Sequence, residues 1–130
     1  MTRLVLISSE IFSRLFRLTK PAEFRQVLDN ARVRKRLGPV RFYAKQNDLG
    51  FPRLGLIVGK RGVPLAVDRN RLKRVVRSDF RKRRTTLAPY DIVVQITARL
   101  TSDELKGLLA DAMLHVGKDA LLSKDDDRKN

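Results

Sequence analysis

The sequence predicts a single α+β domain, and three observations lead to this fold class. The chain has 130 residues, of which 42% are hydrophobic, and this is enough for one sizeable core. Three short apolar runs and one short basic segment are typical of strands, while three longer segments carry apolar residues at helical spacing. No internal repeat and no interior linker separates these elements. We therefore expect all of them to share one core.

The first half of the chain combines one predicted helix with three predicted strands. The predicted elements of the whole chain are a helix from about residue 20, strands at 31–36, 40–44 and 54–58, a helix at 67–84, a strand at 91–97 and a helix at 101–116. Pro21 suits the first position of a helix, and Glu23 suits its first turn. The basic segment 31–36 has the character of an edge strand, and Gly38-Pro39 marks the turn after it.

The second half of the chain carries clearer signals of secondary structure than the first. The segment Gly59–Pro64 breaks the chain after a buried strand and precedes the basic helix. Residues 91–97 are β-branched and nearly continuous in their apolar character, as a buried strand requires. Thr101 followed by Glu104 has the spacing of a capping box, which opens the last helix. The expected inner face of this helix is Leu105, Leu108, Leu109, Ala112, Met113 and Val116.

The two ends of the chain differ from the region between them. Residues 1–13 are expected to form a partly ordered arm, 14–118 the folded domain, and 119–130 a polar tail without fixed structure. The chain has no cysteine, which excludes disulfides and thiolate metal sites and indicates a reducing compartment. No apolar run approaches the roughly 20 residues that span a bilayer. We expect a cytoplasmic protein that does not enter a membrane.

Positive charge is concentrated in one block of the sequence. The chain carries 29 Lys and Arg against 14 Asp and Glu, a net charge of +15. Residues 31–84 hold 18 basic and 3 acidic side chains, so this block alone sums to +15 and the rest sums to zero. Such a local excess of positive charge indicates a binding surface for a polyanion. Nucleic acid fits best, while an acidic protein or a membrane surface is the alternative.

The predicted basic helix divides its residues between two faces. Nine of the sixteen residues from Arg69 to Arg84 are Lys or Arg, and only Asp79 opposes them. At about 100° per residue, one arc gathers the apolar residues Leu72, Val75, Val76 and Phe80, and the opposite arc gathers the cations. Guanidinium groups grip phosphate oxygens in a bidentate fork. One face of this helix is therefore expected to meet a core and the other a phosphate backbone.

The sequence offers little for catalysis by the protein itself. Its single histidine, His115, lies in the last predicted helix without a nucleophile nearby in sequence. The carboxylates are dispersed, and the only cluster, Asp125-Asp126-Asp127, falls in the polar tail. The glycines at 55, 59 and 62 are not followed by the Gly-Lys-Ser/Thr of a phosphate loop. We predict no catalytic residue, metal site or cofactor on this chain.

A second RNA-binding surface is expected where the first helix meets the sheet. Phe24 and Leu28 share one helical face, and Phe42 or Tyr43 lies on the neighbouring strand. Alternation along a strand places Phe42 and Tyr43 on opposite faces, so only one of them can line such a surface. Aromatic rings flanked by cations stack on unpaired bases while the cations hold the backbone.

The order of these motifs resembles the bacterial ribonuclease P protein subunit. The resemblance rests on Arg53-Leu54-Gly55-Leu56-Ile57-Val58-Gly59-Lys60-Arg61 followed by Ala66-Val67-Asp68-Arg69-Asn70-Arg71-Leu72-Lys73-Arg74-Val75-Val76-Arg77. In that family a strand ending in two basic residues leads into a helix with an Arg-Asn-x-x-Lys-Arg-x-x-Arg signature. The likeness extends over roughly residues 14–116. Two departures are Ser78, where the family often has Glu, and the loop Gly62-Val63-Pro64-Leu65, which lacks the Gly-x-Ala-Val spacing of some members. In addition, Leu28 stands where some members carry an aromatic residue.

The resemblance implies a fold, a function and two sets of site residues. The fold would be a four-stranded mixed sheet with helices, in which the basic helix forms a left-handed βαβ crossover, as in some ribosomal proteins. The protein would bind the catalytic RNA of ribonuclease P and the 5′ leader of precursor tRNA, with Mg²⁺ held by the RNA partner and no obligate protein partner. The residues expected at the RNA subunit are Arg69, Asn70, Arg71, Lys73, Arg74, Arg77 and Arg81. Those expected in the leader cleft are Arg17, Phe24, Leu28, Phe42, Lys60 and Arg61.

Several other functions use a basic helix and stay open at this point. A ribosomal protein or RNA chaperone would bind RNA without needing a catalytic RNA. A helix-turn-helix protein would need a second short helix before the basic one, and the break at residues 59–64 argues against it. A stand-alone nuclease would need convergent carboxylates or histidines. A membrane-surface helix would carry larger apolar anchors than Leu72, Val75 and Val76.

Overall fold

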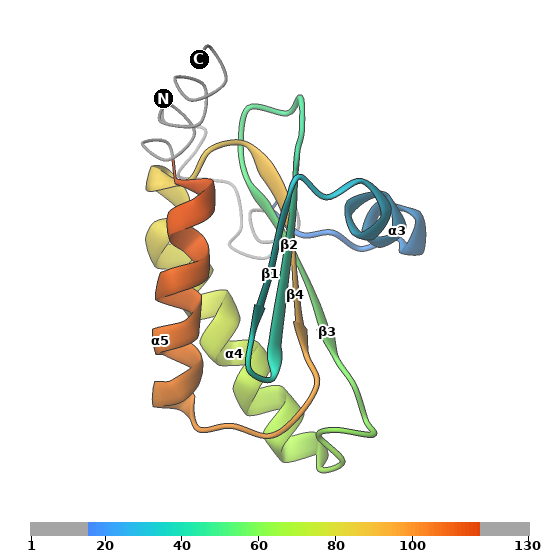
Figure 1. Ribbon diagram of the computed structural model, residues 1–130, viewed down its shortest axis with the longest axis vertical. Coiled ribbons are helices and arrows are strands. Elements are labelled where there is room, and N and C mark those ends of the chain that lie inside the picture. The colour runs from blue at the N-terminus through green and yellow to red at the C-terminus, as the bar shows by residue number, and fades with distance from the viewer. Residues whose placement is uncertain (1–15, 118–130) are drawn as a thin grey trace, which may run out of the picture.

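The computed structural model describes residues 16–117, which form one sheet with helices on both of its faces. Figure 1 shows α4 and α5 side by side on one face and α3 on the other. The elements are α3 (Pro21–Asn30), β1 (Val33–Leu37), β2 (Val40–Gln46), β3 (Arg53–Val58), α4 (Ala66–Arg83), η1 (Arg84–Thr86), β4 (Tyr90–Ile96), α5 (Ser102–Met113) and η2 (Leu114–Val116). The predicted α+β class is confirmed. The predicted arm and tail lie outside the described residues.

The sheet is mixed, with strand order β1-β2-β4-β3. β2 pairs antiparallel with both β1 and β4, whereas β3 runs parallel to β4. The β1–β2 hairpin turns at Gly38, whose φ of 58° suits glycine far better than other residues. β1 is an edge strand with three exposed basic residues, as its sequence predicted.

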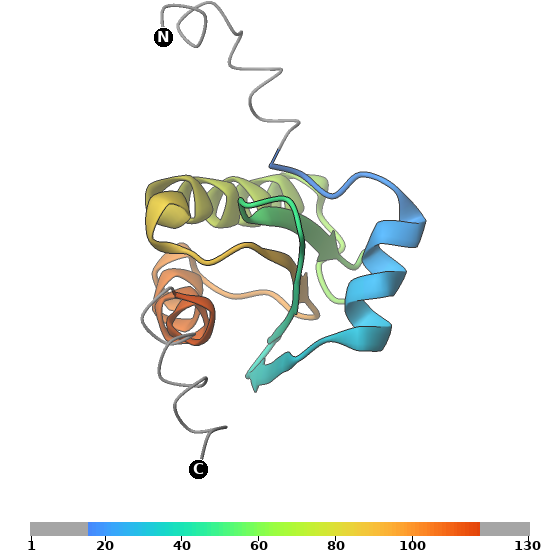
Figure 2. The ribbon, with the colours of Figure 1, turned by 90° about the horizontal axis from the view of Figure 1, so that it is seen from above.

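The connection from β3 through α4 to β4 is a left-handed crossover (Figure 2). Right-handed connections dominate among parallel strands, so this one needs local support. The loop that enters α4 passes directly over the end of β4. A Cβ atom at Gly62 would overlap the carbonyl oxygen of Thr97, so only glycine allows this approach. The next residue, Val63, is fully buried and anchors the loop in the core.

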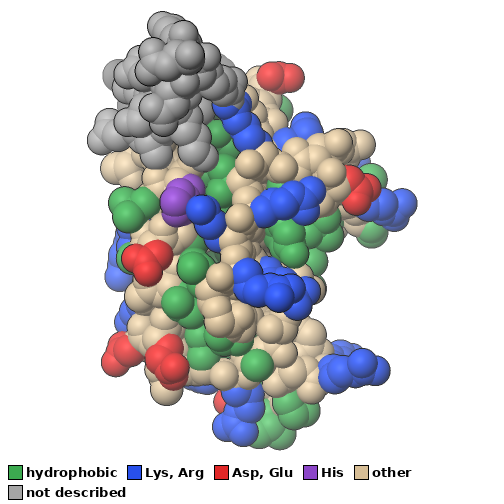
Figure 3. All heavy atoms as spheres, in the orientation of Figure 1, with side chains coloured by type: hydrophobic (Ala, Val, Ile, Leu, Met, Phe, Trp, Pro, Cys, Tyr) green, Lys and Arg blue, Asp and Glu red, His purple; other side chains and the backbone are tan. Residues whose placement is uncertain are grey.

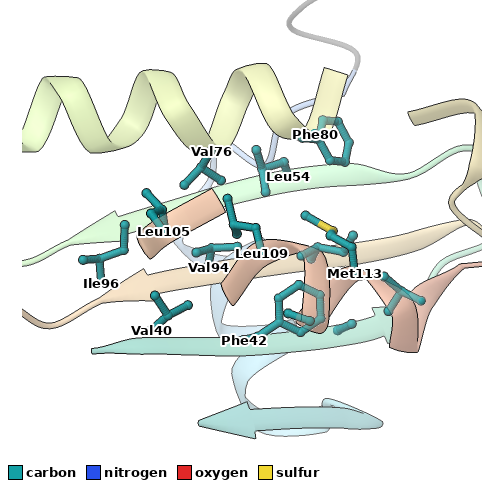
Figure 4. Close-up of a cluster of buried hydrophobic side chains, with 14 of the residues drawn as sticks. Val40, Phe42, Leu54, Val76, Phe80, Val94, Ile96, Leu105, Leu109 and Met113 are labelled. Atoms are coloured by element: carbon teal, nitrogen blue, oxygen red, sulfur yellow. The ribbon is translucent and has the colours of Figure 1, made fainter. Parts of the chain in front are cut away.

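The main core lies between the sheet and the helix pair α4 and α5. Alternate residues of each strand point into it, because successive side chains of a strand face opposite sides. Figure 4 shows side chains of β2, β3 and β4 meeting side chains of both helices. The labelled residues are Val40, Phe42, Leu54, Val76, Phe80, Val94, Ile96, Leu105, Leu109 and Met113. The apolar arcs predicted for both helices are therefore the buried ones, with Val75 and Leu108 at the margin.

A smaller cluster joins α3 to the opposite face of the sheet. Its buried members are Leu18, Val27 and Val93, and Phe24 and Leu28 pack at its margin. A Cβ atom at Gly55 would lie 2.6 Å from the ring of Phe24, so this glycine lets the ring rest on β3. The chain before α3 also extends the sheet. The Leu18 N–H donates to the Leu54 carbonyl at 3.0 Å, and the Leu54 N–H donates to the Phe16 carbonyl at 2.8 Å.

The element boundaries follow the sequence signals closely. Pro21 begins α3, and Thr101 caps α5 by accepting a hydrogen bond from the Glu104 N–H, in the predicted capping box. The last helix differs slightly from the prediction. Its α-helical part stops at Met113, and the chain continues as the 3₁₀ turn η2, which still buries Val116.

Candidate nucleic-acid interface

The basic helix α4 carries its cations on several sides, and only some of them face open surface. Leu72, Val76 and Phe80 are buried against the sheet, which fixes the rotation of the helix. Lys73, Arg77 and Arg81 then follow each other at helical spacing along the side that faces the edge of β3. This side forms one wall of a groove.

The groove lies along the β3 edge of the sheet, beside the residues before α3 that pair with Leu54, and has a volume of about 280 Å³. Its floor is β3, its second wall is the chain before α3, and Phe24 lies beside that wall. The lining residues are Phe16, Arg17, Leu18, Thr19, Phe24, Leu54, Leu56, Lys73, Arg77, Phe80, Arg81 and Arg84. None of these twelve is acidic and five are basic, so the groove concentrates positive potential.

Aromatic contacts shape the upstream end of the groove. The guanidinium carbon of Arg84 lies 4.4 Å from the centroid of the Phe16 ring. Phe51 meets the same ring edge-on, with 5.2 Å between the centroids. Phe16 therefore lines the groove, a position that sequence reasoning missed.

Two arginines face each other across this groove. Burial lowers the pKa of Arg77, and the positive charge of Arg17 on the opposite wall lowers it further. The chain from residue 16 to 117 supplies no carboxylate to the groove that would offset this repulsion. Two unneutralised guanidinium groups at a partly desolvated place favour an anion between them.

The first turns of α4 use their arginines differently. Arg69 donates through Nη1 to the carbonyl oxygens of Val63 at 2.9 Å and Pro64 at 2.8 Å. Its guanidinium group thereby ties the helix to the loop that enters it. The carbonyl groups of that loop gain a charged donor.

Arg71 ties the same end of α4 to the chain that enters α5. It donates to Ser102 Oγ at 3.0 Å and to the Leu100 carbonyl at 3.1 Å. Asp68 lies 3.9 Å from Arg71 and 3.5 Å from Arg99, and so adds ion pairs to this junction. Of the predicted RNA-subunit residues, Arg69 and Arg71 thus hold the crossover together.

The remaining predicted residues of α4 lie on exposed surface. Asn70, Arg74 and Arg81 are exposed, and Lys73 and Arg77 are half-buried. Arg74 lines a shallow hollow between α4 and α5, together with Lys82 and Lys106. Asp79 faces this hollow but pairs with Arg83 at 2.8 Å. The positive surface of α4 therefore continues from the groove around to this hollow.

The face of the sheet beside α3 is open beyond the helix. Figure 3 shows the surface recessed between α3 and the loop that follows β3, with basic side chains at its margins. The strand register places Arg36, Arg41, Gln95 and Ile57 in one row across this face. The predicted cations Lys60 and Arg61 are exposed on the loop at the end of β3.

The predicted leader-cleft residues are only partly brought together. Phe24 and Leu28 lie on α3 at the margin of the recessed face, while Arg17 lines the groove at the β3 edge. The placement of Phe42 in the cleft is wrong, because its side chain is fully buried in the main core (Figure 4). Alternation points Phe42 toward α5 and Tyr43 toward α3. Tyr43 is half-buried there, with the Arg34 guanidinium 5.8 Å from its ring centroid.

An ion-pair network fixes α3 on the sheet. Arg53 pairs with Glu23 at 2.9 Å and with Asp91 at 2.8 Å. Hydrogen bonding to Asp91 raises the pKa of Arg53. The Glu23 carboxylate also accepts the N–H groups of Lys20 and Thr19, each at 3.0 Å, which lowers its pKa. The network holds the start of α3, and with it Phe24, at the head of the groove.

Residues 16–117 contain neither a metal-binding cluster nor a helix able to cross a membrane. No group of three or more His, Cys, Asp and Glu side chains is arranged to hold a metal ion. None of the described helices combines the length and the apolar character that crossing a membrane demands.

Comparison with known proteins gives a consistent result. The family model described as Ribonuclease P matches residues 12–118. A protein named "Ribonuclease P protein component" from Pseudomonas savastanoi pv. phaseolicola is 43% identical over 86 residues. This alignment covers 66% of the chain and 65% of that relative, so the chain spans slightly less than two thirds of the relative's length. A protein of the same name from Azotobacter vinelandii is 44% identical over 86 residues, which is 66% of each chain.

Solved structures show the same fold at lower identity. A ribonuclease P protein mutant from Staphylococcus aureus superposes with a TM-score of 0.69 and 23% identity, over 78% of this chain and 88% of that one. The ribonuclease P protein from Thermotoga maritima gives a TM-score of 0.67 and 22% identity, over 77% and 96%. The four-stranded mixed sheet with its helices is thus a fold that these proteins share.

Proposed function

The chain belongs to the ribonuclease P protein family, and from this premise we propose that it is the RNA-binding protein subunit of the endoribonuclease ribonuclease P. Its partner would be the ribonuclease P RNA, and its substrate would be precursor tRNA with a 5′ leader. The ribosomal or RNA-chaperone alternative is not favoured by the family relationship. The predicted cytoplasmic location stays a prediction.

The observation that carries this proposal is the cationic groove along α4. Five of its lining residues are basic, none is acidic, and the positive surface continues onto Arg74. A row of cations on a rigid helix suits phosphates in a folded RNA, because packing of Leu72, Val76 and Phe80 holds the row in place. We assign α4 to the RNA subunit.

The recessed sheet face beside α3 is the surface that we assign to the leader. Leu28 and Tyr43 offer apolar and aromatic surface at one side, and Lys60 and Arg61 offer charge at the other. Arg36 and Arg41 lie in the row between them. Unpaired nucleotides fit such a surface, since bases stack on rings while cations hold phosphates. Tyr43 takes the place that the sequence had given to Phe42.

The proposed division of labour leaves the chemistry to the RNA. Divalent metal ions bound by the RNA would activate water and stabilise the leaving oxygen. The protein would screen repulsion between RNA strands and add contacts that only a substrate with a leader makes. Contacts made by precursor but not by mature tRNA raise discrimination between substrate and product.

The decisive experiment is cleavage of precursor tRNA by a bacterial ribonuclease P RNA at low millimolar Mg²⁺, with and without this chain. We expect the protein to restore multiple turnover. A Tyr43→Ala, Lys60→Ala, Arg61→Ala variant should keep affinity for the RNA subunit but bind precursor tRNA about tenfold more weakly in the complex. Binding of mature tRNA by this variant complex should not change.

The matched control replaces Leu49, Lys45 and Arg25, which are an apolar residue and two cations outside these surfaces, with Ala. This variant should behave as the parent chain does. Tight RNA binding without restored cleavage would contradict the proposed subunit role. An equal loss of precursor and mature tRNA binding would contradict the assignment of the sheet face to the leader.

A further inference from the structure

The hollow between α4 and α5 is a second positively charged surface, on the α5 side of the basic helix. Its lining includes four cations, Arg74, Lys82, Arg83 and Lys106, and one carboxylate, Asp79. Asp79 pairs with Arg83 at 2.8 Å. Within residues 16–117 no carboxylate pairs with Arg74, Lys82 or Lys106, and all three are exposed. The hollow therefore holds three positive charges that the folded domain does not neutralise.

The described residues end beside this hollow. α4 and α5 run in the same direction, so their last turns lie at the same end of the molecule (Figure 1). There the segment after α4 meets the segment after α5. Leu87 forms an antiparallel bridge with Gly117, and the Ala88 N–H donates to the Val116 carbonyl at 2.9 Å. Gly117 is thereby fixed next to the end of α4, where the chain continues into residues 118–130.

The polar tail carries the only run of three acidic residues in the sequence, Asp125-Asp126-Asp127. Arg128 and Lys129 follow it, so the negative charge is confined to this run. Asp125 is eight residues beyond Gly117, which corresponds to at most about 26–29 Å of extended chain. Along α4, the nine residues from Arg83 back to Arg74 span only about 14 Å. The three carboxylates can therefore reach the whole length of the hollow.

We propose that Asp125–Asp127 bind the hollow between α4 and α5 in the protein without RNA, and that RNA phosphates displace them. Three carboxylates match the three cations that the domain leaves unneutralised, in number and in sign. Each exposed ion pair is weak on its own. Because a short chain joins the partners, their effective concentration is in the millimolar range, which favours this contact over an encounter with another molecule.

The contact would make the polar tail a competitor of RNA. Arg74 belongs to the positive surface that we assign to the RNA subunit, so this consequence rests on the proposed function. RNA phosphates that reach the hollow must displace the carboxylates. The apparent affinity for RNA is then reduced by the fraction of molecules in which the hollow is free. Binding of the tail itself does not depend on RNA and can be measured alone.

The first test detects the contact in the full chain without RNA. A water-soluble carbodiimide joins a carboxylate to a lysine amine when the two groups touch, and mass spectrometry of the digested monomer identifies the pair. We expect amide bonds from Asp125–Asp127 to Lys82 or Lys106 at low salt. They should disappear at about 1 M salt, where the Debye length is about 3 Å. Absence of both products at low salt would overturn the proposal. Products confined to a dimer would overturn it in favour of a second copy of the chain.

The second test measures RNA affinity after the three charges are removed. The variant Asp125→Asn, Asp126→Asn, Asp127→Asn should bind ribonuclease P RNA about fivefold more tightly than the parent at low salt, and equally at high salt. The matched control is Asp29→Asn, Asp48→Asn, Asp111→Asn, which changes the net charge equally at exposed positions. An equal gain in both variants would overturn the competition, because overall charge would then explain it.

A third variant identifies the partner of the tail. Lys82→Gln, Lys106→Gln removes two cations of the hollow, so the Asn substitutions at residues 125–127 should no longer raise RNA affinity in this background. An undiminished gain in the combined variant would place the tail on another surface and overturn the proposal.

The outcomes separate this inference from the proposed function. Carbodiimide products at Lys82 or Lys106 in a chain that does not restore cleavage would support the tail contact and contradict the subunit role. Restored cleavage without those products would support the subunit role and overturn the tail contact.

Discussion

The first turns of α4 and its groove side carry the same residue types but serve different purposes. Arg69 and Arg71 donate four hydrogen bonds to carbonyl and hydroxyl oxygens of the protein, at distances from 2.8 to 3.1 Å. Lys73 and Arg77, only a turn further along, face a groove whose lining residues include no acid. Arg69 and Arg71 stabilise the crossover, whereas Lys73 and Arg77 are the residues that we assign to RNA phosphates.

The difference shows that charge pattern alone does not separate structural from functional arginines. A guanidinium group has five N–H donors and binds whatever oxygen lies in reach. At the start of α4 the tight loop past Gly62 brings its own carbonyls within reach. The described residues that line the groove include no carboxylate, so the groove-side cations Lys73 and Arg77 keep their capacity for phosphate.

The largest effect is expected from the groove side. The variant Lys73→Gln, Arg77→Gln, Arg81→Gln keeps the apolar stems but removes three charges. Its affinity for ribonuclease P RNA should fall on the order of a hundredfold at moderate salt, and its salt slope should fall by about three. Filter binding across a salt series measures both. Its melting temperature should not fall, because mutual repulsion among the cations is relieved.

The control for that experiment removes three charges elsewhere. Arg25, Arg32 and Lys35 are exposed on α3, before β1 and on β1. Replacing them with Gln gives the same net charge as the groove variant. If both triple variants lost affinity equally, overall charge and not the groove would govern binding.

An intermediate effect is expected from the braced end of α4. Arg71→Ala leaves the Leu100 carbonyl without its charged donor, so the free energy of unfolding should fall by about 1–2 kcal/mol. Arg71→Lys keeps the charge but not the forked contact, so we expect it to lose a similar amount of stability. Both variants should keep their RNA affinity, because Arg71 binds protein oxygens. Urea unfolding and RNA binding are measured on both. Arg74→Ala, which removes an exposed cation of the same helix, should weaken RNA binding and leave stability unchanged.

The smallest effect concerns the wall opposite α4. The carboxylate of Glu23 accepts backbone N–H groups of Lys20 and Thr19 and pairs with Arg53, so its pKa in the folded state is below its usual value. Its contribution is therefore present above pH 4.5 and is lost as the pH falls through the lower folded pKa. Glu23→Gln should cost roughly 0.5–1 kcal/mol of unfolding free energy at pH 7 and almost nothing at pH 2. An equal difference at both pH values would show that ionisation of Glu23 is not involved.

The individual helices and strands could be predicted from the sequence because their signals lie within each segment. Pro21 and the pair Thr101 and Glu104 mark helix starts through their own backbone chemistry. The helical spacing of the apolar residues Leu72, Val76 and Phe80 predicts which side of α4 is buried. The family resemblance added the four-stranded mixed sheet and the handedness of the crossover, which periodicity does not encode.

The candidate site could be predicted only in part, because it combines residues from several segments. Alternation showed that Phe42 and Tyr43 face opposite ways, but only the packed sheet decided that Phe42 meets α5. Phe16 carried no periodic signal in the sequence, and only the fold shows that its backbone extends the sheet beside Leu54.

By itself, the sequence determined that this protein has one amphipathic basic helix, a buried apolar arc and a positive block suited to RNA. Those properties follow from composition and spacing within single elements. Only the tertiary structure decided which cations are available. Whether an arginine meets a carbonyl, as Arg69 does, or an open groove, as Arg77 does, depends on chain segments distant in sequence that the fold brings beside it.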